Sequence, residues 1–127
     1  MKILATDMDG TFLDHLGAYD KARLDNLLDA CEAKDYVFTV ASGRALLALE
    51  ELFDGFVDRI AIIAENGALV QYKGEVLFES KLEPKDYLQI ADTTLSLPTC
   101  EGILLSGRRG AYAPNDADPA YLKAMER

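Results

Sequence analysis

Three short apolar segments separated by helix-like segments constrain the fold of this chain more than any other feature. The apolar segments are residues 2–7, 36–40 and 60–64. The third is continuously apolar, as expected of a strand that is buried on both faces. Residues 20–33 and about 44–53 lie between them and have the apolar periodicity of helices. This strand, helix, strand order predicts an α/β fold with a parallel sheet.

The second half of the chain has a different pattern. Residues 68–79 contain two short strand-like segments joined through Lys73-Gly74, which predicts a hairpin. A helix is predicted to begin at Pro84, because proline suits the first helical turn. A second hairpin is predicted within residues 102–113, followed by a final helix that starts after Asp118 and runs to Arg127.

The first apolar segment stops at two carboxylates, Asp7 and Asp9, which are followed at once by Gly10 and Thr11. Strand side chains alternate between faces, so Asp7 and Asp9 are expected on the same side. Open parallel sheets bind their ligands at the carboxyl ends of the strands. A phosphate-handling site is therefore the leading hypothesis, and a strand followed by a polar turn is the alternative.

Further candidates for a polar site follow the other strands. Ser42 comes directly after the second strand, where its hydroxyl and the neighbouring N–H groups can hold a phosphate oxygen, or where it can be an ordinary helix N-cap. Arg44 is expected to face either the phosphate or solvent. Asn66-Gly67 indicates a tight turn and leaves a supporting role open. Arg108 and Arg109 are interpreted as a solvated turn.

The charge balance restricts the classes of partner. The chain has 22 acidic and 13 basic residues, which gives a formal net charge of −9. This balance argues against nucleic acid as a partner and repels a phosphorylated substrate unless the site supplies positive charge. A shared Mg²⁺ is the simplest way to keep two neighbouring carboxylates ionised together. The sequence has no signal-peptide pattern and no apolar stretch of membrane-spanning length, so we expect a cytoplasmic protein without a membrane partner.

Three motifs, in order, resemble those of the haloacid dehalogenase superfamily. Residues 7–13 match its first motif without interruption, and residues 40–44 resemble its second. Residues 64–68 are similar to a segment typical of its Cof-type sugar-phosphatase branch. The resemblance implies a Rossmann-like, three-layer core with an α+β cap. It assigns residues 1–81 to the amino-terminal part of the core and residues 82–127 to part of the cap.

The same resemblance implies a mechanism, which is Mg²⁺-dependent hydrolysis of small phosphorylated metabolites, in particular sugar phosphates. Asp7 would be the nucleophile that forms an aspartyl-phosphate, and Asp9 would act as general acid and then general base. The metal ion would be held by the side chain of Asp7 and the backbone carbonyl of Asp9. The residues implied to bind the phosphate are Met8, Gly10, Thr11, Ser42 and Gly43.

Two parts of the superfamily's site have no counterpart in the sequence. These are a lysine from a later strand and a still later acidic motif. We therefore expect the chain to be the amino-terminal part of a longer enzyme. The alternative from another class is a non-catalytic fragment or phosphate-binding module. A phosphoacceptor receiver domain is a third hypothesis, although its acidic residues are usually adjacent and lack the Gly-Thr that follows here.

Overall fold

The computed structural model describes residues 1–125. The chain divides into two compact units, Met1–Ser80 and Lys81–Arg127, and each is described by itself. The sequence-based boundary, between residues 81 and 82, lies one residue further along the chain. The assignment of the two parts to a core and a cap stays a prediction.

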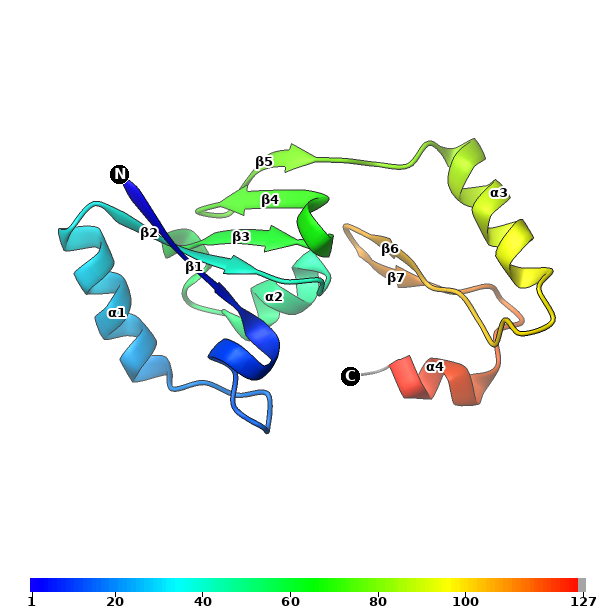
Figure 1. The fold of residues 1–127 in the computed structure, drawn as a ribbon, viewed down its shortest axis with the longest axis horizontal. Coiled ribbons are helices and arrows are strands. Elements are labelled where there is room, and N and C mark those ends of the chain that lie inside the picture. The colour runs from blue at the N-terminus through cyan, green and yellow to red at the C-terminus, as the bar shows by residue number, and fades with distance from the viewer. Residues whose placement is uncertain (126–127) are drawn as a thin grey trace. The chain divides into compact units, whose positions relative to one another are not determined.

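The first unit contains a mixed five-stranded sheet in the order β1-β2-β3-β4-β5 (Figure 1). Its strands are β1 (Lys2–Asp7), β2 (Tyr36–Ala41), β3 (Ala61–Ala64), β4 (Leu69–Tyr72) and β5 (Glu75–Glu79). β1, β2 and β3 are mutually parallel, whereas β4 and β5 are antiparallel to their neighbours and form the predicted hairpin. The predicted α/β fold with a parallel sheet is thus confirmed for the first three strands.

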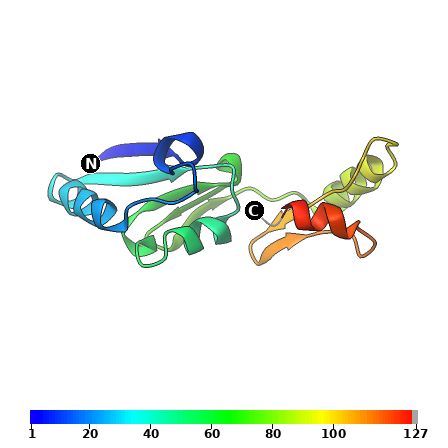
Figure 2. The same cartoon turned by 90° about the horizontal axis from the view of Figure 1, so that it is seen from below.

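Two helices connect the parallel strands and lie on the same side of the sheet (Figure 2). α1 (Lys21–Ala33) joins β1 to β2 and is capped as predicted, because the Asp20 carboxylate accepts from the Arg23 N–H at 3.0 Å. α2 (Leu46–Leu52) lies between β2 and β3. Parallel strands joined by crossovers of one hand place their helices on one face. Of the three layers that the resemblance implies, the described residues of this unit supply two.

A single hydrophobic core lies between these helices and the sheet. Its fully buried members include Met8, Leu49, Phe53, Ile60 and Ile62. They come from the turn after β1, from α2 and the segment that follows it, and from β3 and the residue before it. The core therefore anchors the segments that leave the carboxyl ends of the strands as well as the elements themselves.

Arg59 holds α1 against the segment that precedes β3. Its guanidinium donates to the carboxylates of Asp25, Asp29 and Glu32, which lie one turn apart along α1, at 2.5 to 2.8 Å. These hydrogen bonds, led by the one to Glu32, raise the pKa of Arg59. The positive charge of Arg59 thereby reduces the repulsion among three like charges.

The two edges of the sheet are exposed in the first unit. β1 pairs with β2 alone, and Ile3 and Leu4, which point to opposite faces, are 68% and 41% exposed. β5 is the other edge, and its Leu77 and Phe78 are exposed as well. Apolar side chains are therefore found in solvent at both ends of the strand order.

The second unit contains α3 (Pro84–Leu95), the hairpin of β6 (Leu105–Gly107) and β7 (Gly110–Tyr112), and α4 (Pro119–Met125). Pro84 starts α3 as predicted. α4 starts after Asp118, whose carboxylate accepts from the Ala120 N–H at 2.7 Å. The predicted extension of this helix to Arg127 lies outside the described residues. No helix in the described part of the chain is long and apolar enough to cross a bilayer.

Candidate active site

The carboxyl ends of β1, β2 and β3 meet at one edge of the sheet, because the three strands are parallel (Figure 1). Asp7 is the last residue of β1 and is in register with Ala41, the last residue of β2. Ser42 follows directly, and its N–H donates to the Ile63 carbonyl of β3 at 2.9 Å. The first predicted carboxylate and the predicted hydroxyl group are thus placed at the ends of neighbouring strands.

The second carboxylate, Asp9, lies in a turn and not on the strand. β1 ends at Asp7, and Met8–Phe12 form a turn with non-helical backbone at Asp9 and Gly10, closed by the Leu13 N–H, which donates to the Met8 carbonyl at 3.0 Å. The strand alternation used to place Asp9 therefore does not extend that far. The Met8 side chain is completely buried in the core, whereas Asp7 and Asp9 are exposed. A phosphate contact from Met8 is limited to its backbone.

Gly10 gives this turn its sharp exit. Its φ of 75° lies in the left-handed region, and a Cβ added there would meet no atom within 4 Å. Glycine is therefore favoured by the backbone conformation and not by a lack of space. Thr11 follows and is exposed, at the rim of a hollow of about 470 Å³ between this loop and α1.

Arg44 is the residue that the structure brings to Asp9. Its Nε donates to Asp9 Oδ2 at 3.1 Å and its second terminal nitrogen to Asp9 Oδ1 at 2.5 Å, across 35 residues of sequence. This two-pronged hydrogen bond lowers the pKa of the exposed Asp9 carboxyl. The same hydrogen bonds that keep Asp9 ionised also lower its affinity for a proton. The sequence left the direction of Arg44 open, and the structure turns it toward Asp9.

The Arg44→Met variant is expected to raise the pKa of Asp9 toward its ordinary value. Methionine keeps part of the apolar stem and removes the guanidinium whose hydrogen bonds stabilise the ionised form. Carboxyl carbon NMR over an acidic pH series would report the shift. Arg23→Met is the matched control, because Arg23 is exposed on α1 and the ion pair of Asp9 is with Arg44. An unchanged Asp9 titration in Arg44→Met would show that the pair does not form in solution.

Ser42 is buried, with 9% of its surface exposed, and its hydroxyl accepts from the Arg44 N–H at 3.2 Å. The alternative interpretation of Ser42 as the N-cap of the next helix is wrong. α2 begins at Leu46 after Ala45, which makes no side-chain cap. The helix was expected to begin at about Arg44, which instead belongs to the loop before it. The Ser42 hydroxyl therefore stabilises this loop and remains near the strand end.

The carboxylate oxygens of Asp7 and Asp9 are ligands of the type that a hard cation prefers. Mg²⁺ is commonly bound through one or two carboxylates, with water and substrate phosphate completing the octahedron. The carboxylates of Asp7 and Asp9 are both exposed and close in sequence. Within residues 1–125, no group of three or more His, Cys, Asp or Glu side chains is arranged to hold a metal ion. Asp7 and Asp9 are thus the residues at this edge that could hold such an ion.

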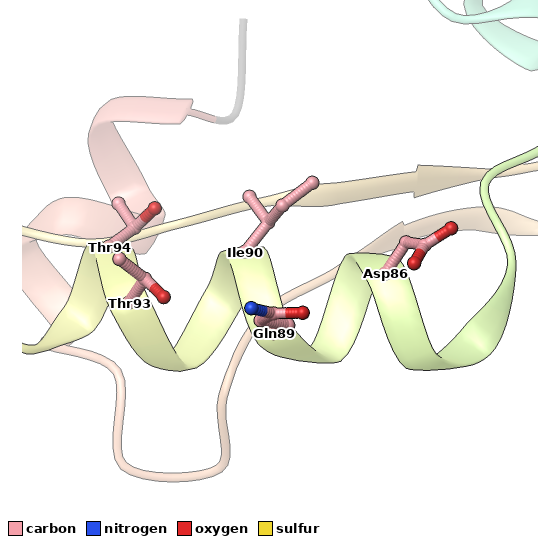
Figure 3. A pocket seen from close by; sticks show the side chains of 5 residues that line it. All are labelled: Asp86, Gln89, Ile90, Thr93 and Thr94. Carbon is pink, nitrogen blue, oxygen red and sulfur yellow. The ribbon is translucent and has the colours of Figure 1, made fainter.

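Other candidate residues belong to the second unit. Arg108 and Arg109 are exposed in the turn between β6 and β7 of the second unit. A shallow pocket of about 400 Å³ lies along one face of α3 and is lined by Asp86, Gln89, Ile90, Thr93 and Thr94 (Figure 3). None of the residues predicted to handle phosphate contributes to it.

Comparison with known proteins agrees with the motifs. Residues 4–126 match the family model of the haloacid dehalogenase-like hydrolases. This chain belongs to that family. The match covers nearly the whole chain, and it confirms the resemblance that the three ordered motifs indicated.

Two relatives are at least 30% identical to this member of the haloacid dehalogenase-like hydrolases. The 5-amino-6-(5-phospho-D-ribitylamino)uracil phosphatase YbjI of Escherichia coli strain K12 is 32% identical over 126 residues, which are 99% of this chain and 46% of the relative. The crystal structure of SMU.1108c from Streptococcus mutans UA159 has a TM-score of 0.85 at 30% identity, over 98% of this chain and 46% of the other. The chain thus spans about half the length of these relatives.

A more distant structure shares the fold. BT4131, a sugar phosphatase of haloacid dehalogenase subclass IIB, has a TM-score of 0.62 at 23% identity, over 91% of this chain and 45% of its own. The α/β architecture with a mixed sheet is therefore that of the haloacid dehalogenase-like hydrolases.

Proposed function

We propose that this chain carries the nucleophile and the acid/base group of a phosphatase that hydrolyses small phosphorylated metabolites. The observation that carries the proposal is the pair Asp7 and Asp9 at the carboxyl end of β1, with Arg44 bonded to Asp9. Membership of the haloacid dehalogenase-like hydrolases supports it. The proposal concerns the whole protein, because its relatives are about twice as long as this chain.

The first step would use Asp7 as the nucleophile. A carboxylate oxygen of Asp7 forms a bond to phosphorus while the bond from phosphorus to the ester oxygen breaks, which gives an aspartyl-phosphate and an alcohol. Asp9, in its protonated form, supplies the proton that the leaving oxygen needs. Because Arg44 favours the ionised form of Asp9, this step requires the ion pair to loosen.

The second step would use Asp9 as a base. The Asp9 carboxylate takes a proton from water, the water oxygen bonds to phosphorus, and the bond from phosphorus to Asp7 breaks. Inorganic phosphate leaves and both aspartates return to their starting states. The ion pair with Arg44 keeps Asp9 in the ionised form in which this step begins, and the pair has to loosen when Asp9 takes up the proton.

The remaining residues would hold the phosphate. Backbone N–H groups around Gly10 and the hydroxyl groups of Thr11 and Ser42 are donors of the kind that bind phosphate oxygens. Asp7 and the backbone of Asp9 would hold Mg²⁺, which when bound offsets the negative charge that the phosphate and the carboxylates bring together. With the chain's net charge of −9, such compensation is a requirement for binding an anion.

The substrate class that we propose is a phosphorylated sugar or sugar alcohol. The E. coli relative is named for a phosphoribityl compound, and BT4131 is described as a sugar phosphatase. The motif at residues 64–68, which resembles the Cof-type branch, supports the same class.

One observation favours a second candidate, a phosphate-binding module without turnover. Within residues 1–125, the carboxylates of Asp7 and Asp9 are not joined by a third metal-ligating side chain. A chain with this donor set would bind phosphate through Mg²⁺ and backbone groups but release no product from an ester.

Trapping with hydroxylamine distinguishes the two candidates. The purified chain is mixed with Mg²⁺ and a panel of sugar and sugar-alcohol phosphates, and inorganic phosphate is measured. An acyl phosphate reacts with hydroxylamine, so the phosphatase is expected to acquire a hydroxamate on the peptide that carries Asp7 during turnover. Phosphate release without modification of Asp7 would contradict the mechanism. Binding of inorganic phosphate with neither release nor modification would support the module.

A further inference from the structure

The turn between β3 and β4 has an uncommon backbone. Glu65, Asn66 and Gly67 have φ values of 53°, 54° and 93°, so three consecutive residues lie in the left-handed region. Asparagine tolerates this region better than most residues, whereas glutamate seldom adopts it. Such a conformation persists only where surrounding contacts maintain it, and residues of this kind concentrate at functional sites.

The contacts that maintain this turn lead to the loop after β2. The Asn66 N–H donates to the Ser42 carbonyl at 3.2 Å, and the Glu65 N–H donates to the Arg44 carbonyl at 3.0 Å. These two bonds join the turn to the loop after β2, beyond the ends of both strands. The segment that it reaches, Ser42–Arg44, contains the predicted phosphate-binding hydroxyl and the arginine bonded to Asp9.

The side chain of Asn66 adds a packing contact at the middle of this segment. A Cβ built on Gly43 would lie 2.9 Å from Asn66 Oδ1 and 3.2 Å from Asn66 Nδ2. The carboxamide therefore occupies the space that any other residue at position 43 would need. Glycine at 43 and asparagine at 66 are therefore complementary, because the missing side chain of Gly43 leaves the space that the Asn66 carboxamide fills.

We propose that Asn66 is a positioning residue for the proposed phosphatase site. Its turn and its carboxamide hold the Ser42–Arg44 segment, and through the guanidinium of Arg44 they hold the Asp9 carboxylate. The inference deepens the proposed function and rests on it for its catalytic meaning. The mechanical part, that Asn66 fixes Arg44, can be tested without turnover.

The first test compares Asn66→Gly with Lys73→Gly. Lys73 lies in the turn between β4 and β5 with a φ of 51°, so both substitutions place glycine at a left-handed residue, and Lys73 is not part of the site. Two readouts are used, amide hydrogen exchange at Arg44 and Glu65 and the NMR signal of the Arg44 Nε–H, which donates to Asp9.

We expect Asn66→Gly to speed exchange at Arg44 and Glu65 about tenfold and to broaden or shift the Nε–H signal. Lys73→Gly leaves both unchanged. The conservative Asn66→Asp variant keeps the shape of the side chain and a tolerance of the left-handed region, and so retains the slow exchange. Equal exchange at Arg44 in the wild type and Asn66→Gly would overturn the inference.

A double-mutant cycle tests the packing contact. Gly43→Ala introduces a methyl group against the carboxamide, and Asn66→Gly removes the carboxamide. In the double variant the methyl group has room. If the two sites were independent, the rate increases of the single variants at Arg44 would multiply. We expect the exchange rate of the double variant to be at least about threefold below that product. Multiplicative effects would show that residues 43 and 66 do not act on each other and would contradict the inference.

Titration with inorganic phosphate in the presence of Mg²⁺ separates the inference from the proposed function. If the chain binds phosphate, Asn66→Gly is expected to weaken that binding about fivefold and Lys73→Gly to leave it unchanged. Absence of phosphate binding in the wild type, together with the expected exchange pattern, would overturn the proposed function and keep the positioning role. If the wild type binds phosphate and Asn66→Gly binds it equally well, Asn66 does not position the proposed phosphatase site.

Discussion

Replacing Asp7 with asparagine is expected to lower the rate of phosphate release about a thousandfold or more, because loss of a nucleophile removes the covalent route. The carboxamide oxygen of asparagine is neutral and a poor nucleophile, while its size and shape match those of aspartate. Asp7 is exposed at the end of β1, so the fold should not suffer from the exchange. The measurement is initial phosphate release with Mg²⁺ and the best substrate of the panel, together with thermal unfolding.

Asp58→Asn is the matched control for this experiment. Asp58 is an exposed carboxylate in the short helical turn before β3, at the opposite edge of the sheet from the strand ends that form the site. We expect its rate to stay within about a factor of two of the wild type, as for a surface substitution without a special contact. If Asp7→Asn kept most of the wild-type rate, Asp7 would not be the nucleophile.

Replacing Phe53 with alanine is expected to destabilise the first unit by about 3 to 5 kcal/mol. Phe53 is completely buried after α2, and its ring lies 5.1 Å from that of Tyr19 and 6.0 Å from that of Phe12. Removal of the ring leaves a cavity among side chains that cannot collapse freely. Since small domains are stable by only about 5 to 15 kcal/mol, this loss would shift unfolding to much lower urea concentrations.

The same substitution should loosen the candidate site. Phe12 ends the turn that contains Asp9, and Tyr19 lies in the loop after it, with its hydroxyl donating to the Leu52 carbonyl at 2.9 Å. Phe78→Ala is the control, because Phe78 is 54% exposed on β5 and its loss should cost less than about 1 kcal/mol. Urea unfolding followed by tyrosine fluorescence compares the two. Similar midpoints for both variants would contradict the assignment of Phe53 to the core.

Local patterns were sufficient to predict most elements of the fold. The apolar runs located β1, β2 and β3, and they coincide with buried side chains in β2 and β3 but not in β1. Asp20, Pro84 and Asp118 located the starts of α1, α3 and α4, since caps and first-turn prolines act within a few residues. The paired strands β4 and β5 followed from the two residues between them.

Long-range contacts account for what the sequence could not predict. α2 begins at Leu46, two residues after the predicted start, because the Arg44 carbonyl accepts a hydrogen bond from the Glu65 N–H and the backbone at Ala45 is extended. Helical periodicity carries no information on such a bond. The turn at Met8–Phe12 depends on a buried methionine in the same way.

The residues of the candidate site were proposed from the sequence, whereas their contacts came from the structure. Asp7, Asp9 and Ser42 were candidates because each ends a strand or closely follows one. The bond between Arg44 and Asp9 spans 35 residues, and neither position alone indicates the other. Asn66 was left between a plain turn and a supporting role. Gly43 is the sequence signal that favours a supporting role for Asn66. A helix start does not require glycine, whereas close packing against the Asn66 carboxamide does.

The exposed edge strands have a consequence for handling the isolated chain. A strand edge with free N–H and C=O groups and apolar side chains is a template for pairing with a strand of another molecule. β1 offers such an edge with Ile3 and Leu4, and β5 offers another with Leu77 and Phe78. Concentrated solutions are therefore prone to sheet-extending aggregation. The chain's large negative charge works against that association, most strongly at low ionic strength.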